Sequence, residues 1–352
     1  MGSMKKRKNG KKKKISTSKL VILFIVFELI FTTATGPYML YYGPFKKAKT
    51  TVVGAAMTTL TLQWLAKAFL SDAKINEIMK GQTVAVIAQE KSDGVNAGVK
   101  VENKNDNNIE RYEIKGNKYK GYVLIIKDPT RIRVGYSSKL LNEGNVPKEG
   151  ERTSEIAKAN NAIAAVNGGA FVDEAAGAQW AGTGAKPTGI IITDGKEIFN
   201  DIKNENGKTD VVAITKDGKL LVGGHSIKEM KERGVTEAVS FGPAFIVNGK
   251  KTITSDDDND NNGGSGIAPR TAIGQRSDGA IILLVIDGRQ LKSMGADYKE
   301  VQDVLYEYGA VNASNLDGGS SSTMFYDDEV ISNPSDSYGE RSIPSIIYVE
   351  SR

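Results

Sequence analysis

The stretch Asp278-Gly-Ala-Ile-Ile-Leu-Leu-Val-Ile-Asp-Gly-Arg289 holds the features on which the fold class depends. Its central run, residues 280–286, is apolar throughout and has the length of a β-strand. The Asp278-Gly279 pair before the run suits a type I′ hairpin turn, whose two central residues need positive φ. Asp287-Gly288 places polar residues directly after it. The stretch therefore predicts a strand that is entered from a hairpin and ends in a polar motif.

Asn-Gly and Asp-Gly pairs adjoin apolar runs in three further places. Repeated hairpins of this kind predict a mixed, largely antiparallel sheet with a few packed helices. Because the helices are interspersed without the rhythm of parallel βαβ units, the predicted class is α+β. The other turn pairs are Asp194-Gly195, Asp217-Gly218 and Asn248-Gly249; the expected strands are residues 121–127, 131–135, 189–193, 211–215, 220–222 and 244–247; and the expected helices are residues 155–162, 227–233 and 298–308.

The N-terminal region has the pattern of a membrane anchor. Residues 1–19 form a basic tail, with nine Lys or Arg residues between Lys5 and Lys19 and no acid among them. Residues 20–42 contain a single charge, Glu28, and match the roughly 20 residues that cross a bilayer. The positive-inside rule places the tail in the cytoplasm and the rest of the chain outside. A cleaved signal peptide is the alternative interpretation.

The segment after the anchor is predicted to be a juxtamembrane amphipathic helix within residues 43–80. Its apolar-rich part, residues 52–70, is interrupted by Lys67 and several Thr residues. A second membrane span is the alternative, and it would return the rest of the chain to the cytoplasm. Residues 81–352 are assigned to one domain. We therefore expect a single-pass protein of the cell membrane whose main domain is extracytoplasmic.

The composition excludes several kinds of chemistry. The chain has no cysteine and one histidine, His225, so thiolate catalysis, Cys metal sites and clusters of His ligands are excluded. Acid–base chemistry then falls to Asp, Glu, Tyr or Lys. The net charge is +5, and without the nine basic residues of the tail it becomes 5 − 9 = −4. A mildly acidic domain argues against a nucleic-acid partner.

Four glycine-containing motifs lie beside apolar runs, where backbone can approach a ligand closely. The planar forks of Arg270 and Arg289 suit a phosphate group. The backbone N–H groups of residues 168–169 and 318–320 suit an anion nest. Asp287 and Asp317 have the side chains needed for the paired carboxylates of a glycosidase. The motifs are Val166-Asn-Gly-Gly-Ala-Phe171, Ala268-Pro-Arg-Thr-Ala-Ile-Gly274, Ile286-Asp-Gly-Arg289 and Asn315-Leu-Asp-Gly-Gly-Ser-Ser-Ser-Thr323.

Together with Ser240-Phe-Gly-Pro243 and residues 295–300, these motifs resemble those of the phosphodiester glycosidase family. The resemblance covers both the uncovering-enzyme-like domain, which acts on N-acetylglucosamine-1-phosphodiesters, and the bacterial exopolysaccharide-type members. It runs from about residue 162 to the C-terminus and implies a hydrolase. The chain departs from the family pattern at Ser320, where a third Gly is usual, and at Ala170, where Phe is more common. Ser320 would narrow the nest if that position needed positive φ.

The resemblance implies a catalytic group and a substrate-binding group of residues. Local alternatives stand beside five of them. They are a capping box with Asp297 for Glu300, a hairpin turn for Asp287, a structural ion pair for Arg270, the capping of a turn for Asp317, and the fixing of its own turn for Asn167. The implied catalytic residues are Asp317, Asp287, Arg270 and Glu300; the implied substrate-binding residues are Asn167, Gly168, Gly169, Thr271, Arg289, Gly318, Gly319, Ser320 and Ser321.

The expected function is hydrolysis of a sugar-1-phosphodiester bond in a cell-surface glycopolymer or glycolipid of a bacterial envelope, such as teichoic acid or exopolysaccharide. A non-catalytic glycan-binding or exopolysaccharide assembly protein and a metal-dependent phosphodiesterase are the alternatives. No cofactor or metal is expected, and the acidic stretch Asp256–Asp260 is interpreted as a surface loop, with a calcium site as the alternative. The expected partners are the glycan and the lipid bilayer, and the oligomeric state is left open.

Overall fold

The computed structural model describes residues 16–57, 62–80, 98–141, 149–172, 174–175, 178–179, 183–184, 186–253, 266–336 and 338–352. The chain divides into two compact units, residues 1–49 and 50–352. The first unit contains one long helix, and the second contains all the sheets.

The long helix of the first unit is α1 (Thr17–Tyr42). It begins at Ser16, whose side chain accepts a hydrogen bond from the Lys19 amide. Its 26 residues extend about 39 Å at 1.5 Å per residue, which exceeds the ~30 Å hydrocarbon core of a bilayer. Among the residues that the structure describes, it is the one helix long and apolar enough to cross a membrane.

The segment predicted as a single amphipathic helix forms three short helices instead. They are α2 (Lys46–Met57), α3 (Trp64–Lys67) and α4 (Asp72–Lys80). α2 crosses the boundary between the units, and its residues from Thr50 onward belong to the second. α3 and α4 are separate helices because α4 has its own N-terminal cap: the Ser71 hydroxyl accepts a hydrogen bond from the Lys74 amide.

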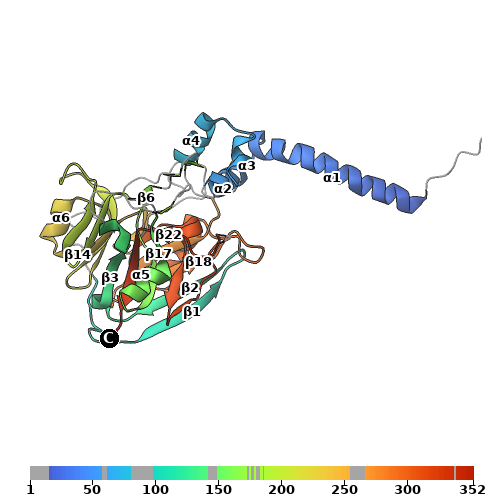
Figure 1. The fold of residues 1–352 in the computed structure, drawn as a ribbon. Coiled ribbons are helices and arrows are strands. Elements are labelled where there is room, and N and C mark those ends of the chain that lie inside the picture. The colour runs from blue at the N-terminus through green and yellow to red at the C-terminus, as the bar shows by residue number, and fades with distance from the viewer. Residues whose placement is uncertain are drawn as a thin grey trace, which may run out of the picture. The chain divides into compact units, whose positions relative to one another are not determined.

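Three antiparallel sheets build the second unit (Figure 1). Every strand pairing that the structure describes is antiparallel, so the predicted α+β class is confirmed and the sheets are less mixed than expected. The seven-stranded sheet has the order β1 (Ile109–Lys115), β2 (Lys120–Ile126), β18 (Ile281–Ile286), β17 (Arg270–Arg276), β19 (Ala310–Leu316), β15 (Ala244–Val247) and β16 (Lys250–Lys251).

The other two large sheets have five strands each. One has the order β11 (Lys196–Asn200), β10 (Ile190–Thr193), β14 (Val235–Ser240), β12 (Thr209–Thr215) and β13 (Leu220–His225). The other has the order β21 (Glu329–Val330), β20 (Met324–Tyr326), β5 (Ala162–Asn167), β23 (Ser345–Glu350) and β3 (Ile132–Tyr136). Two-stranded pieces join β22 (Ser342–Ile343) to β4 (Glu151–Arg152), β6 (Phe171–Val172) to β9 (Lys186–Pro187), and β7 (Glu174–Ala175) to β8 (Ala178–Gln179).

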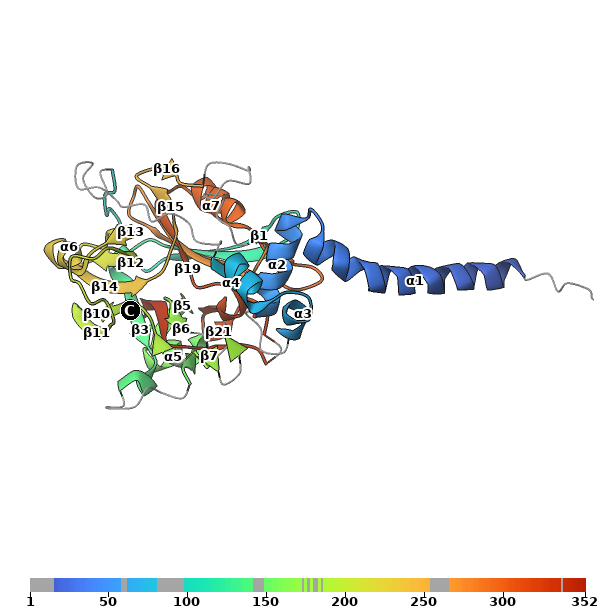
Figure 2. The ribbon, with the colours of Figure 1, turned by 90° about the horizontal axis from the view of Figure 1, so that it is seen from above.

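The apolar run at residues 280–286 is explained by burial on both faces of its strand. On β18, Leu283 and Val285 belong to the core shared by all three sheets. Ile282 and Leu284 belong to a second core, beneath α7 (Tyr298–Glu307), which lies against the seven-stranded sheet (Figure 2). A strand covered on both sides has no polar face, so its sequence does not alternate.

The four turn pairs form two kinds of turn. Asp194-Gly195 and Asn248-Gly249 have positive φ at both residues, as a type I′ hairpin requires. At residues 217–218 and 278–279 only the glycine has positive φ. At residues 217–218, the Gly218 amide donates to Thr215 O at 2.8 Å. This is the pattern of a longer hairpin loop, in which a glycine with positive φ follows the turn.

The predicted helices form, with shifted ends. α6 (Ile227–Glu232) and α7 begin at capping boxes formed by Ser226 and Asp297. α5 (Thr153–Ala159) starts and ends earlier than expected. Short 3₁₀ turns are η2 (Pro129–Arg131), η3 (Ser138–Leu141) and η4 (Gly319–Ser321).

Candidate active site

The ends of three strands bring separate sequence motifs to one edge of the seven-stranded sheet. β17 begins at Arg270, whereas β18 and β19 end at Ile286 and Leu316. Because β17 runs antiparallel to both neighbours, its first residues pair with their last residues: Arg270 with Ile286, and Thr271 with Leu316. Asp317 therefore follows β19 directly beside the start of β17.

Asn167 connects this edge to a different sheet, since it is the last residue of β5. Its side-chain amide donates to Asp317 O at 2.5 Å, and its Oδ1 accepts from Thr271 Oγ1 at 2.7 Å and from the Thr323 amide at 3.1 Å. Asn167 and Thr271 are completely buried. Neither residue lines the cavity at this edge of the sheet: Asn167 holds the backbone of Asp317 in place, and Thr271 holds the side chain of Asn167.

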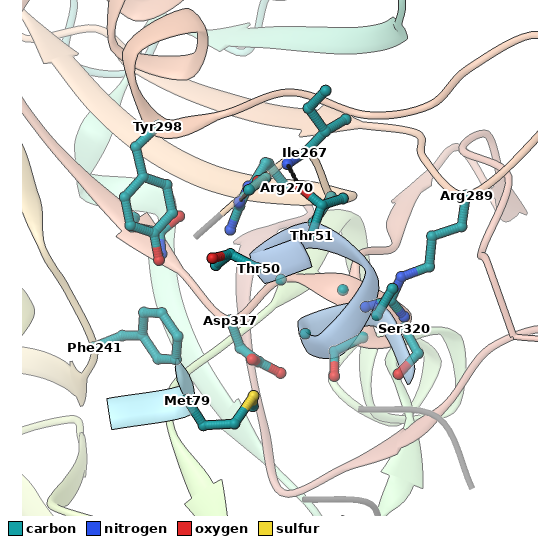
Figure 3. Close-up of a pocket in the computed structure, with 18 of the residues that line it drawn as sticks. Thr50, Thr51, Met79, Phe241, Ile267, Arg270, Arg289, Tyr298, Asp317 and Ser320 are labelled. Atoms are coloured by element: carbon teal, nitrogen blue, oxygen red, sulfur yellow. Dashed lines mark hydrogen bonds between the residues drawn. The ribbon is translucent and has the colours of Figure 1, made fainter. Parts of the chain in front are cut away.

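A cavity of about 300 Å³ opens in front of these strand ends (Figure 3). Its charged residues, among those described, are three arginines and one aspartate. Figure 3 shows Asp317 near the centre of the cavity, with Arg289 beside Ser320 on one side. The lining consists of Thr50, Thr51, Gly54, Ala55, Met79, Ala170, Phe171, Phe241, Gly266, Ile267, Ala268, Arg270, Arg289, Tyr298, Asn315, Asp317, Gly318, Gly319, Ser320, Ser321 and Arg341.

The guanidinium group of Arg270 is held rigidly by neutral partners. Its Nε donates to Ala296 O at 3.0 Å and its Nη2 to Gly266 O at 2.6 Å. The guanidinium carbon lies 4.4 Å from the ring centre of Tyr298, which is a cation–π contact. Burial lowers the pKa of Arg270 from its ordinary value. This arginine is therefore fixed in direction before any ligand binds.

Arg289 and Arg341 converge on the backbone that follows Asp317. Arg341 Nη1 donates to Ser320 Oγ at 3.3 Å. Arg289 has φ +58, a left-handed conformation that costs a non-glycine residue about 1 kcal/mol. Burial, together with the charges of Arg270 and Arg341, lowers the pKa of Arg289 to about 10. Arg289 therefore remains positively charged at neutral pH.

The glycine at position 319 is required by its surroundings. Gly319 has φ +64, and a Cβ there would lie 3.2 Å from Arg289 Nη2. Ser320 is not among the described residues with positive φ, so the serine in place of the family's third glycine introduces no backbone strain. The Gly319 amide donates to Pro269 O at 2.9 Å, which ties this loop to the start of β17.

Gly168 and Gly169 differ from the predicted anion nest. Their amides donate to Ser345, to its carbonyl at 2.9 Å and to its hydroxyl at 3.1 Å. The carbonyl of Gly168 accepts from the Asp317 amide at 3.2 Å. The two glycines thus support Asp317 from behind, because their N–H groups are used within the protein.

Two predicted carboxylates lie outside the lining of the cavity. Asp287 Oδ1 accepts from the Asn333 amide at 2.9 Å, and burial raises the pKa of this carboxyl to about 6. Glu300 closes the capping box of α7 and lies 3.1 Å from Lys118 Nζ. The local alternative therefore explains Glu300, and neither carboxylate lines the cavity with Asp317. The stretch Asp256–Asp260 lies outside the described residues.

The sequence motifs did not indicate several residues of the lining. Arg341 lies next to β22 without a glycine motif, and Phe241 lies within a motif that was used only for the resemblance. Asn315 begins the last of the four glycine motifs but had no assigned role; its side-chain amide donates to Gly242 O at 3.2 Å and to the Tyr298 hydroxyl at 3.3 Å. Tyr298 begins α7 and lies within residues 295–300, a stretch to which the sequence assigned no site role apart from Glu300.

Replacing Asp287 with Asn is expected to leave hydrolysis nearly unchanged and to alter the pH dependence of stability. The unfolded pKa is near 3.9, so the stability that this group contributes is full below about pH 4 and is lost as the pH rises through 6. The variant cannot ionise, so its stability relative to the wild type should rise by on the order of 2 kcal/mol between pH 4 and pH 7.5. Unfolding curves at both pH values measure this, and an equal difference at both would contradict it.

Comparison with known proteins supports the assignment of the motifs. The model of the phosphodiester glycosidase family matches residues 160–350, more than half of the chain. The N-acetylglucosamine-1-phosphodiester alpha-N-acetylglucosaminidase of Bos taurus is 29% identical over 175 residues, 49% of this chain and 29% of that protein. The SPbeta prophage-derived uncharacterized protein YomE of Bacillus subtilis is 43% identical over 68 residues, 19% of this chain and 11% of that protein. Each match spans less than a third of the relative's length.

A solved structure has the same fold. The catalytic domain of the zebrafish N-acetylglucosamine-1-phosphodiester alpha-N-acetylglucosaminidase, described as auto-inhibited by its pro-peptide, aligns with a TM-score of 0.55 at 24% identity. The alignment covers 76% of this chain and 87% of that one. With its motifs gathered at one strand edge and more than half of its residues matched by the family model, the chain belongs to the phosphodiester glycosidase family.

Proposed function

We propose that the cavity binds a sugar-1-phosphodiester and hydrolyses the bond between the anomeric carbon and the phosphate oxygen. The observation that carries this proposal is one carboxylate, Asp317, in the same cavity as the guanidinium groups of Arg270, Arg289 and Arg341. The name of the bovine relative describes hydrolysis of an N-acetylglucosamine-1-phosphodiester. Family membership supports the same class of reaction here.

The leaving group explains why arginines outnumber acids in the lining. Breaking the anomeric C–O bond releases a phosphomonoester, which departs as an anion and does not depend on a general acid as an alkoxide does. The transition state develops negative charge on the phosphate oxygens, and fixed guanidinium groups stabilise that charge. Arg270 is suited to this role because its hydrogen bonds to Ala296 and Gly266 orient it in advance.

Asp317 is the residue to which we assign the chemical step at carbon. It either activates a water molecule or attacks the anomeric carbon, and the stereochemical outcome distinguishes the two. Among the described lining residues it is the single carboxylate, so a second acid–base group would come from elsewhere. Asn167 is a positioning residue in this proposal, because it holds the Asp317 carbonyl and does not line the cavity.

Hydrolysis in oxygen-18-labelled water tests which bond is cleaved. We expect the label in the released sugar, since water adds to the anomeric carbon when the C–O bond breaks. Label in the phosphate would show P–O cleavage and would favour a metal-dependent phosphodiesterase. Binding without turnover of any sugar-1-phosphodiester would favour a non-catalytic glycan-binding protein. The matched control is the same reaction in unlabelled water with the products mixed afterwards into labelled water.

We further propose that α1 anchors the enzyme in a bacterial cell membrane with the cavity on the outer side. The basic tail before α1 and the length of the helix support this orientation. Substrates on that side are wall or capsule glycopolymers and glycolipids with sugar-1-phosphate links, including teichoic acid and exopolysaccharide. Protease added to intact cells should then digest the domain, and protection of the domain would contradict the orientation.

A further inference from the structure

One wall of the cavity comes from the N-terminal segment of the second unit. Thr50, Thr51, Gly54 and Ala55 of α2 line the cavity, as does Met79 of α4. These residues precede residue 160, where the family match begins. Figure 3 shows Thr50 and Thr51 beside Arg270 and facing the same space as Asp317. The segment before the matched region therefore takes part in forming the site.

A short chain of contacts connects α2 to the guanidinium group of Arg270. Thr51 Oγ1 accepts a hydrogen bond from the Ile267 amide at 3.3 Å. Gly266 packs so closely on Thr51 that a Cβ at Gly266 would lie 2.0 Å from the same hydroxyl oxygen. The Gly266 carbonyl in turn accepts from Arg270 Nη2 at 2.6 Å. The hydroxyl of Thr51 thus fixes the backbone that orients Arg270.

The composition of α2 suits a helix that lines the cavity and does not suit an inhibitory segment that would occupy it. The helix, Lys46–Met57, has no acidic residue, so it presents nothing that imitates a phosphate to the arginines. The side chains that it turns to the cavity are small and uncharged. A cavity of about 300 Å³ remains with the helix in place. Pockets of this size and larger hold small-molecule ligands.

We propose that α2 is part of the substrate-binding site and that Thr51 is a positioning residue for Arg270. The proposal rests on the proposed function only for the identity of the substrate, because anion binding alone reports the position of Arg270. Displacement of α2 would leave the Gly266 carbonyl free to move and would deprive Arg270 of one of the contacts that fix its direction. The segment that contains α2 therefore forms part of the substrate-binding site and does not block access to it.

The test compares Thr51→Val with Thr51→Ser in the full chain. Valine keeps the branched shape and removes the hydroxyl acceptor, whereas serine keeps the acceptor. Binding of inorganic phosphate is measured by calorimetry, and hydrolysis of a sugar-1-phosphodiester is measured alongside. We expect Thr51→Val to weaken phosphate binding about fivefold, the effect of losing one hydrogen bond, and Thr51→Ser to stay within about twofold of wild type. Val52→Ala, at a position outside the lining, controls for general weakening of the helix.

A double-mutant cycle separates positioning from mere stability. If Thr51 acts through Arg270, Thr51→Val should have less than about a twofold further effect in an Arg270→Lys background. A full fivefold effect in that background, equal binding by the valine and serine variants, or tighter binding and faster hydrolysis after Thr51→Val would each overturn the proposal. So would an absence of phosphate binding by the wild type. Phosphate binding with the expected pattern but no hydrolysis would reject the proposed function and keep this inference.

Discussion

Asp317→Asn is expected to lower kcat for a sugar-1-phosphodiester by about a thousandfold, while inorganic phosphate still binds. The amide cannot act as a nucleophile or a base, and in the proposed function the phosphate is held chiefly by the arginines that line the cavity. The backbone contacts of the residue, from Asn167 to its carbonyl and from its amide to Gly168, do not involve the carboxylate. The fold should therefore survive. Release of free sugar under saturating substrate measures the effect.

Asp287→Asn is the matched control for this substitution. Both aspartates follow a strand of the same sheet and precede a glycine, but the cavity is lined by Asp317 and not by Asp287. Wild-type turnover by the Asp317→Asn protein would contradict the assignment of the chemical step to Asp317. A large loss of turnover in the Asp287→Asn protein, with normal folding, would restore the pair of carboxylates suggested by the sequence.

Arg270→Gln is expected to lower kcat/KM by at least about a hundredfold and also to destabilise the protein. The substitution removes a charge that the proposed function directs at the phosphate, and removal of one such preorganised group typically costs a factor of 10²–10³. It also removes the donors to Ala296 O and Gly266 O and the contact with Tyr298. A hydrogen bond from a charged donor contributes about 1.5–3 kcal/mol to stability, and two of them are lost here.

Arg276→Gln on the same strand provides the control for losing an arginine. Arg276 ends β17, and its Nη2 lies 3.4 Å from Asp278 Oδ2. Because this ion pair is partly exposed, its loss should lower the stability of the protein only slightly. Steady-state kinetics and unfolding curves of both variants, measured side by side, separate the two effects. Equal kcat/KM for the two variants would show that Arg270 has a structural role only.

The sequence was informative where a local rule and the tertiary environment agree. The hairpin turn at Asn248-Gly249 and the capping boxes of α6 and α7 follow from residues a few positions apart. Strand β18 could be located because burial on both faces leaves a continuous apolar run. Three of the glycine motifs meet at one edge of this sheet, since the ends of antiparallel neighbours lie together there.

The sequence was uninformative where two motifs look alike and their surroundings differ. Asp287-Gly288 and Asp317-Gly318 are the same dipeptide after a similar strand. The chain after Asp287 turns through the left-handed Arg289, and the Asn333 amide binds the carboxylate, so the two aspartates take different directions. The contribution of α2 could not be predicted either, because Thr50 and Thr51 carry no motif and reach the site only through tertiary packing.

The bonds of Asn167 have a consequence for how the enzyme matures. Asn167 joins segments near residues 271, 317 and 323, and its strand β5 lies between β20 and β23, the last strand described. These partners are some 100 to 180 residues downstream, so a chain still being made has no assembled catalytic centre. Such distant pairings slow folding, and we expect hydrolytic capacity to emerge in one step after β23 has been made and paired, rather than in stages.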